Sequence, residues 1–313
     1  MSDTPTEPPR PRVALSLGAG GAKGLAYIGV IEEIEACGYE IVAIAGSSMG
    51  ALIGGIYAAG KLDVYRDWVS ALAKLDVLRL VDWSLSGGGL IKGERIIDVL
   101  RELIGDERIE DLPIAYTAVA TDIDRQREIW LDRGPLFDAI RASIAIPSVF
   151  RPHMRNGRRL VDGGLLNPVP VMPLLSTDSD YIVAVSVDGP AEKAPLRVEQ
   201  AADAEDATPP GHRQRIAEFV SRLVPHGEPK VHEPGALELL NQAMDLMQAN
   251  LASLRLAAYR PDLLIELPRN MATSYQFYRA RELIERGRSK AREALDGWER
   301  LEPPRPSTAR DRA

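Results

Sequence analysis

The stretch VAIAGSSMGALIGGIYA, Val42 to Ala58, decides the fold that we predict for this chain. A β-branched apolar run leads into Gly46-Ser47-Ser48-Met49-Gly50, and an apolar pattern rich in small residues follows at once. This order predicts a strand, a sharp turn and a helix. In a G-x-S-x-G turn the central serine, here Ser48, occupies a strained corner, and glycines flank it because a Cβ there would strike neighbouring backbone. The pattern therefore predicts a serine hydroxyl that projects from the end of a strand.

The helix that follows this turn adds a second chemical feature. Its first N–H groups have no partner inside the helix, and its dipole places partial positive charge at the same corner. Both features favour a developing oxyanion. The chain has 26 glycines, however, so a short pattern of glycine and serine also arises by chance. The assignment of Ser48 therefore depends on what the rest of the sequence supplies.

Composition narrows the class of protein. The chain has 313 residues, of which 45% are hydrophobic and 27% are charged, so it can bury the core of one large or two small domains. The formal charge of −7 argues against nucleic acid as a partner, because phosphate contacts require a basic face. Cys37 is the only cysteine, which precludes an intramolecular disulfide framework and suits a reducing compartment, so we expect a cytoplasmic protein.

Hydropathy indicates whether any segment of the chain could cross a membrane. Residues 1–11 are polar and rich in proline, and we expect a disordered tail there rather than a secretory signal. The apolar run from Ala51 to Ala59 is much shorter than the roughly 20 residues that span a bilayer. Any contact with a membrane must therefore be peripheral.

A glycine-rich loop precedes the serine turn. Val13 to Leu17 reads as a strand, and Gly18 to Gly24 then leads into a helical pattern. A dinucleotide fingerprint fails on spacing, because Lys23 stands where its last glycine should be. The alternative is that the N–H groups of Gly20 and Gly21 form a concave anion site, which beside the serine turn is an oxyanion hole. Lys23 is then either a substrate contact or a solvated residue of the first helical turn.

A candidate carboxylate follows a predicted hairpin. Met154 to Val161 reads as two short strands that turn at Asn156-Gly157, and the hairpin delivers Asp162-Gly163-Gly164. An acidic residue at a strand end, followed by glycines that allow other backbone to approach, suits a catalytic carboxylate. The alternative is that Asp162 only stabilises a turn through an Asx hydrogen bond.

Four motifs together resemble a known family. The Gly20-Gly21-Ala22-Lys23-Gly24 loop and the serine turn are followed by Ala142-Ser143-Ile144-Ala145-Ile146-Pro147 and by Asp162-Gly163-Gly164 with Asn167-Pro168-Val169-Pro170. In this order they resemble the patatin-like phospholipases, over residues 12 to about 188. Bacterial proteins of about this length are the most similar, although Ala19 stands where the family's loop commonly has glycine.

The resemblance implies a catalytic dyad and an activity. Ser48 is the implied nucleophile and Asp162 the implied general base, with the N–H groups of Gly20 and Gly21, and of Met49, holding the oxyanion. The implied reaction is hydrolysis of carboxylic esters of lipids, without metal or other cofactor. A dyad without histidine also agrees with where the histidines lie in the chain. His153 is the only one outside a polar, proline-rich region and is therefore the only rival base. A protein that keeps the scaffold but binds lipid without turnover, or with slow turnover, is the alternative function.

The expected architecture is an α/β domain over residues 12–298, with a mostly parallel central sheet and helices on both faces. Residues 189–235 read as a mobile insertion or lid, and 299–313 as a disordered tail. Ala236 to Tyr259 predicts a long helix. Its apolar stripe, which we interpret as core packing rather than an acyl-chain groove, comprises Leu240, Met244, Met247, Leu251 and Leu254.

Overall fold

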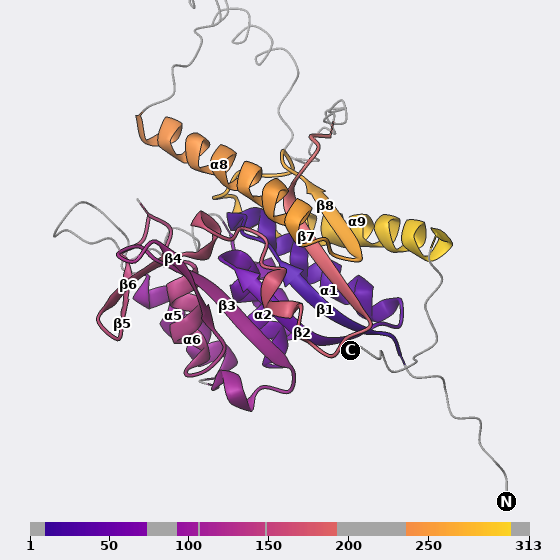
Figure 1. Ribbon diagram of the computed structural model, residues 1–313, viewed down its shortest axis with the longest axis horizontal. Coiled ribbons are helices and arrows are strands. Elements are labelled where there is room, and N and C mark those ends of the chain that lie inside the picture. Colours follow the sequence, from indigo (N-terminus) through magenta and orange to yellow (C-terminus); the bar gives the residue numbers. More distant parts are fainter. Residues whose placement is uncertain (1–9, 74–92, 106, 148, 193–235, 302–313) are drawn as a thin grey trace, which may run out of the picture. The chain divides into compact units, whose positions relative to one another are not determined.

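The computed structural model describes residues 10–73, 93–105, 107–147, 149–192 and 236–301 (Figure 1). The chain divides into two compact units: residues 1–192 with 244–313, and residues 193–243. The sheet and the candidate site belong to the first of these units. The predicted insertion at 189–235 and the tails at 1–11 and 299–313 lie almost entirely outside the described residues.

A mixed sheet forms the centre of the first unit. Its strands are β1 Arg12–Leu17, β2 Glu40–Ser47, β3 Ala115–Asp122, β4 Arg127–Leu131, β5 His153–Arg155, β6 Arg158–Asp162, β7 Tyr181–Gly189 and β8 Leu263–Pro268. Five strands pair in parallel in the order β3-β2-β1-β7-β8, whereas β4, β5 and β6 join by antiparallel pairing. The prediction of a mostly parallel sheet flanked by helices is confirmed.

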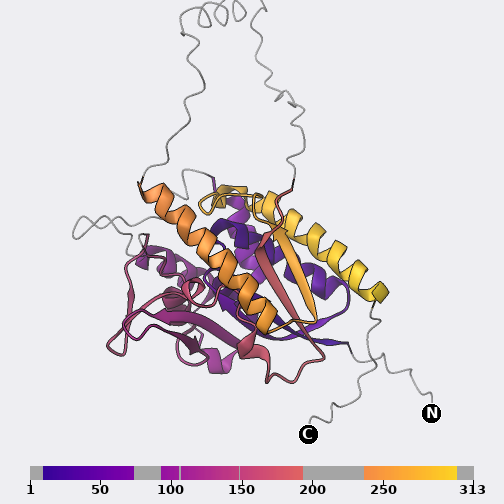
Figure 2. The ribbon, with the colours of Figure 1, turned by 45° about the horizontal axis from the view of Figure 1, so that its top comes forward.

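Helices surround this sheet. They are α1 Ala26–Ala36, α2 Met49–Ala58, α3 Leu62–Ala71, α5 Glu94–Ile104, α6 Leu136–Ser143, α8 Ala236–Ala258 and α9 Ala280–Leu301. Side chains of α1, α2 and α9 share the main buried cluster with Leu15 and Leu17 of β1. The neighbouring residue Ala14 points the other way, because side chains alternate along a strand. On that opposite face Ala252 of α8 packs against Ala184 of β7, and Figure 2 shows α8 crossing this strand.

The strand β3 brings two distant segments together. Its Val119 pairs with Ser47 of β2 on one edge and with Trp130 of β4 on the other. The next residue, Ala120, pairs with Asp162 of β6 and again with β4. Because β4 occupies one edge throughout, β2 and β6 must share the other edge. The C-terminal ends of β2 and β6 therefore face each other along this edge, and the residues after Ser47 lie beside Asp162.

Local turn chemistry explains the hairpin that carries Asp162. Asn156 and Gly157 both have positive φ angles, of 51° and 71°. These values suit the two central residues of a tight hairpin turn, where asparagine and glycine are favoured. The predicted hairpin is confirmed, and it ends one residue later than expected because Asp162 itself still pairs with β3.

Two helix predictions need correction. The sequence pattern of Ser274 to Trp298 predicts a final helix, but α9 begins at Ala280 because Ser274 O accepts a hydrogen bond from Ala22 N (3.0 Å) and Ser274 is held in a loop. The apolar stripe of the long helix is not core packing, because Leu240, Met247 and Leu254 are exposed. That helix packs through its opposite side instead. The apolar spacing of Leu62 to Leu80 also predicts a helix. α3 ends at Ala71, and residues 74–80 lie outside the described residues.

Candidate active site

Ser48 occupies a strained corner between β2 and α2. Its φ and ψ angles are 54° and −120°, and a positive φ is costly for a residue with a Cβ. The flanking glycines permit this corner, because a Cβ on Gly46 would overlap the backbone of Gly50 and one on Gly50 would overlap Leu17 O. The predicted reason for glycine at both positions is therefore confirmed. This geometry is that of a nucleophile elbow.

A serine on α6 holds the corner in place. The hydroxyl of Ser143 accepts a hydrogen bond from Ser48 N (2.9 Å) and donates one to Val119 O (2.6 Å). Ser143 is fully buried, so both bonds form away from water. Sequence reasoning gave Ser143 no role of its own. The available signal was a hydroxyl residue at the buried end of a short amphipathic helix.

We predict that Ser143→Ala lowers both stability and activity. The variant leaves the buried Ser48 N–H without its acceptor, which costs about 1–3 kcal/mol of unfolding free energy. Because the corner then shifts, kcat should fall by about tenfold to a hundredfold. Urea unfolding and ester hydrolysis measure the two effects. Ser16→Ala is the control, since the buried Ser16 hydroxyl has no hydrogen-bond partner among the described residues. Equal kcat values in the two variants would contradict the positioning role.

Asp162 is fixed at the start of a short 3-10 helix, Gly163–Leu165. Its Oδ1 accepts a hydrogen bond from Gly164 N (2.7 Å), and its own N–H donates to Ala145 O (3.0 Å). Only 2% of the residue is exposed. The bond to Gly164 is the Asx-type turn that the sequence left open as an alternative. It engages one carboxylate oxygen and leaves Oδ2 for another role.

Burial raises the pKa of Asp162 to about 6. The Ser48 hydroxyl and then Gly164 N lower the pKa by hydrogen bonding, but burial has the larger effect. The influence of Ser48 places its hydroxyl close to the carboxyl, whereas Oδ2 has no partner of full hydrogen-bond geometry among the described residues. The two groups are therefore adjacent but not aligned for a hydrogen bond. Catalytic hydrogen bonds are often long before substrate binds.

The glycine-rich loop lies between β1 and α1. A Cβ on Gly20 would lie 2.5 Å from Val187 Cγ2, and one on Gly21, whose φ is 54°, would lie 2.8 Å from Ser274 O. Ala19 N and Ala22 N donate to Pro168 O (2.8 Å) and Ser274 O (3.0 Å), which fixes the loop on both sides. Among the described residues, the N–H groups of Gly20, Gly21 and Met49 donate no backbone hydrogen bond in turns, loops or caps. Their role in holding an oxyanion stays a prediction.

We predict that Gly21→Ala lowers kcat by about a hundredfold to a thousandfold, in the range found when an oxyanion donor is lost. The new methyl group would collide with Ser274 and would force the loop to move. Gly38→Ala is the matched control, because Gly38 also has positive φ but has open space around its Cβ position. The Gly38→Ala variant therefore has the backbone strain of alanine at positive φ without a steric collision. Similar losses of kcat in both variants would show that strain alone is responsible.

Lys23 lies beside this loop in a buried position. Only 9% of the residue is exposed, so the alternative of a solvated lysine is wrong. Its Nζ lies 3.9 Å from Asp188 Oδ1, at the end of β7. Burial raises the pKa values of Asp188 and Asp245, and Lys23 opposes both shifts. This cation near the glycine loop therefore pairs with Asp188 of β7 and acts electrostatically on Asp245 of α8.

The rival base is engaged elsewhere. His153 Nε2 lies 2.6 Å from Asp138 Oδ1, and Arg155 Nη1 lies 3.1 Å from the other oxygen of that carboxyl. The pKa of Asp138 is lowered, mainly by its hydrogen bond to His153. The arrangement ties the β5 hairpin to α6. A role for His153 as the base of Ser48 has no support in these contacts.

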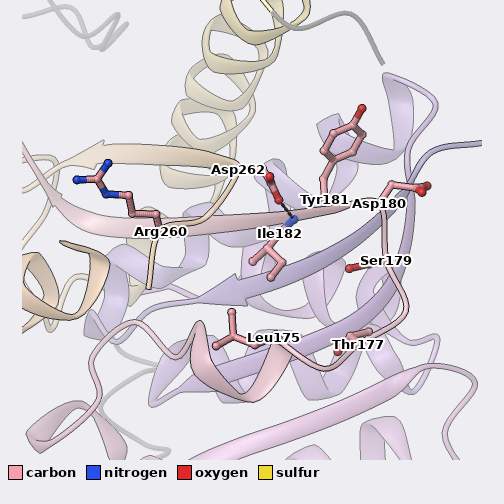
Figure 3. A pocket seen from close by; sticks show the side chains of 8 residues that line it. All are labelled: Leu175, Thr177, Ser179, Asp180, Tyr181, Ile182, Arg260 and Asp262. Carbon is pink, nitrogen blue, oxygen red and sulfur yellow. Dashed lines mark hydrogen bonds between the residues drawn. The ribbon is translucent and has the colours of Figure 1, made fainter. Parts of the chain in front are cut away.

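A shallow pocket lies at the opposite end of the sheet (Figure 3). Tyr181 and Ile182, at the start of β7, line it together with Asp262, just before β8. Asp262 Oδ2 accepts a hydrogen bond from Ile182 N (2.7 Å), as Figure 3 shows, so this carboxyl already has a structural role. None of the predicted site residues lines this pocket. The candidate site is instead at the carboxyl ends of β1 and β2, where ligands of parallel sheets bind.

A mostly parallel sheet with a serine at a strand-turn-helix corner defines the class of α/β proteins built around a nucleophile elbow. Comparison with known proteins identifies the family. Residues 15–175 match the patatin-like phospholipase family, and the chain belongs to that family. The resemblance inferred from the four motifs is thereby confirmed.

Relatives agree with this family. The chain is 40% identical to an uncharacterised NTE family protein of Mycobacterium tuberculosis (strain ATCC 25618 / H37Rv) over 339 residues, which cover 92% of both chains. It is 30% identical to lysophospholipase NTE1 of Saccharomyces cerevisiae over 193 residues, covering 59% of this chain and 11% of that protein. The crystal structure of VipD from Legionella pneumophila is similar with a TM-score of 0.43 and 14% identity, covering 93% of this chain and 67% of that one.

Proposed function

We propose that this protein is a serine hydrolase that cleaves carboxylic esters of lipids with Ser48 as nucleophile and Asp162 as general base. The observation that carries the proposal is the shared edge of β3, where Ser47 and Asp162 occupy consecutive positions. Membership of the patatin-like phospholipase family supports a lipid substrate. The name of the yeast relative, a lysophospholipase, supports the same class of bond.

The proposed reaction begins with transfer of the Ser48 proton to Asp162 Oδ2. As the proton leaves, Ser48 Oγ attacks the ester carbonyl, and the carbonyl oxygen becomes negative. N–H groups of Gly20, Gly21 and Met49 receive this charge, with the partial positive charge of the α2 N-terminus beside them. The intermediate then expels the alcohol, which takes the proton from Asp162, and an acyl-enzyme remains.

The second half of the proposed reaction releases the acid. Water loses a proton to Asp162 and attacks the acyl carbonyl, and the same N–H groups hold the second oxyanion. Collapse of this intermediate breaks the bond to Ser48 Oγ, which recovers its proton from Asp162. A carboxyl whose pKa is about 6 is a stronger base than an ordinary aspartate and is still ionised at neutral pH. Lys23 is proposed as a substrate contact near the mouth of the site.

Location and membrane contact belong to the same proposal. We propose a cytoplasmic protein that meets its substrate at the periphery of a membrane, because the single cysteine suits a reducing compartment. None of the helices in the described part of the chain has the length and hydropathy that a bilayer crossing needs.

The substrate class is tested by incubating purified protein with lysophosphatidylcholine and with diacyl phosphatidylcholine vesicles. Mass spectrometry should detect free fatty acid together with the deacylated glycerophosphocholine or lysolipid. Release of a headgroup instead of a fatty acid would contradict the assignment to carboxylic esters. Absence of turnover, with tight lipid binding, would favour the alternative of a patatin scaffold that binds without hydrolysis.

A further inference from the structure

The part of α8 that belongs to the first unit, residues 244–258, turns apolar side chains to solvent. Leu246, Met247 and Leu254 are 65%, 62% and 69% exposed. At about 100° per residue, these three positions fall on one side of the helix. Single exposed leucines are ordinary on protein surfaces, but a cluster of large apolar side chains on one helix marks an interaction surface. We call Leu246, Met247 and Leu254 the α8 apolar surface.

The opposite side of the same helix packs inward and is mixed, with one arginine among apolar residues. Arg255 donates a hydrogen bond to Leu166 O (2.9 Å) and also contacts Glu128 (3.1 Å), while Ala252 is buried. Leu256 and Tyr259 on this inner side pack against the buried cluster that contains Ala252. The inner contacts of α8 are thus made by other residues, and Leu246, Met247 and Leu254 are left at the surface.

The inner side of α8 also lies against the candidate active site. A Cβ on Gly164 would lie 3.2 Å from Gln248 Nε2 and 3.0 Å from Asp162 Oδ1. Gln248 thus lies beside the loop that carries Asp162. One turn earlier, Asp245 is close enough to Lys23 for that cation to oppose the rise in its pKa, which burial causes. The α8 apolar surface is therefore on the outer side of the helix that borders the proposed site.

Two tyrosines lie in the segment before α9. Burial raises the pKa of Tyr275, and the carboxylate of Asp245 in α8 raises it further. Tyr275 is nevertheless 56% exposed, and Tyr278 is also exposed. Tyrosine combines an apolar ring with a polar tip and is enriched where proteins meet the membrane–water boundary.

We propose that the α8 apolar surface docks on the surface of aggregated lipid and thereby presents the adjoining site to its substrate. The inference rests on the proposed function, because it takes the substrate to be a lipid ester. A lipid surface fits better than a second copy of the chain, because the helix that carries the apolar surface also borders a site whose proposed substrate itself lies in that lipid. An interfacial helix of this kind buries its apolar side chains at the boundary of headgroups and acyl chains.

The test compares two triple variants of the full chain. L246Q/M247Q/L254Q removes the α8 apolar surface, and glutamine keeps the propensity for helix. V64Q/M154Q/L175Q is the matched control, because Val64, Met154 and Leu175 are exposed apolar residues on other elements. Each protein, in an otherwise Ser48→Ala background, is co-sedimented with phosphatidylcholine vesicles, with and without phosphatidylserine. Hydrolysis of a short p-nitrophenyl ester below its aggregation concentration is measured with Ser48 intact.

The expected result is vesicle binding at least about tenfold weaker for the α8 variant than for the control, given the burial of three large apolar side chains. Hydrolysis of the monomeric ester should stay within about twofold of wild type, since surface substitutions rarely disturb a site. Equal vesicle binding by the two variants would overturn the proposal. So would a wild-type dimer that the α8 variant converts to monomer without loss of vesicle binding. Vesicle binding is independent of turnover, so failure of the hydrolase proposal would appear separately, as no ester cleavage by any protein.

Discussion

The Ser48→Ala variant is expected to lose ester hydrolysis by at least about a thousandfold, because no other group can form the acyl-enzyme. Alanine removes only the hydroxyl and keeps the strained corner, so the fold should persist. The measurement is steady-state hydrolysis of a p-nitrophenyl acyl ester by purified protein, with circular dichroism as the check on folding.

Ser47→Ala provides the control for this prediction. Ser47 is the neighbouring serine, but its hydroxyl donates to Asn167 O (2.6 Å) and is directed to a structural role. We expect Ser47→Ala to lose stability, by about 1 kcal/mol for one buried hydrogen bond, and to keep most of its activity. Activity that survives in Ser48→Ala and disappears in Ser47→Ala would reverse the assignment of the nucleophile.

The Asp162→Asn variant is expected to lower kcat by about a hundredfold to ten-thousandfold, the usual contribution of a general base. The amide keeps an oxygen that accepts the hydrogen bond from Gly164 N, so the loop should stay in place. It cannot accept the proton of Ser48. A variant with normal kcat would mean that another group serves as base.

The pH dependence follows from the raised pKa of the same carboxyl. A general base must be ionised, and the pKa of Asp162 is about 6. In the wild type, kcat/KM should therefore be constant above about pH 7 and fall about tenfold per pH unit below 6. The residual activity of Asp162→Asn should lack this inflection. A wild-type profile that is flat down to pH 4 would contradict the role of Asp162.

Stability should depend on pH in the opposite direction to activity. As the pH rises, kcat/KM should increase while the free energy of unfolding decreases. Burial raises the pKa of Asp162 from 3.8 to about 6, so the folded state binds a proton that the unfolded chain releases. The stability associated with this proton is present below pH 3.8 and is lost as the pH rises through 6. At pH 7 the buried carboxylate therefore costs up to about 3 kcal/mol. Asp162→Asn should unfold at a higher temperature than wild type at pH 7, and the difference should disappear below about pH 4.

Much of the sheet and the positions of the candidate residues could be predicted from sequence because their chemistry is local. The glycines around Ser48 are needed where backbone passes closely, and Asn156-Gly157 has the φ angles that a tight turn requires. The pattern that carries each of these constraints is a short run of neighbouring residues, even where the close approach is to a distant segment, as for Gly50 and Leu17. Patterns of this kind remain visible in a single sequence.

Other features depend on contacts between distant segments. The bond from Ser48 N to Ser143 joins residues 95 positions apart, and Ser274 is diverted from helix by a contact with Ala22. The exposure of Met247 depends on which side of α8 finds partners, and periodicity alone cannot decide that. The pKa of Asp162 is likewise set by burial that the assembled sheet creates. Tertiary structure determines all four.

Covalent labelling with a fluorophosphonate tests the central claim most directly, because the reagent forms a stable adduct only with an activated serine. The labelled protein is digested, and peptide mass spectrometry locates the adduct. The dyad proposed here predicts modification of Ser48, with labelling slowed in Asp162→Asn and abolished in Ser48→Ala. No adduct on the wild type, or an adduct on another serine such as Ser143, would contradict it.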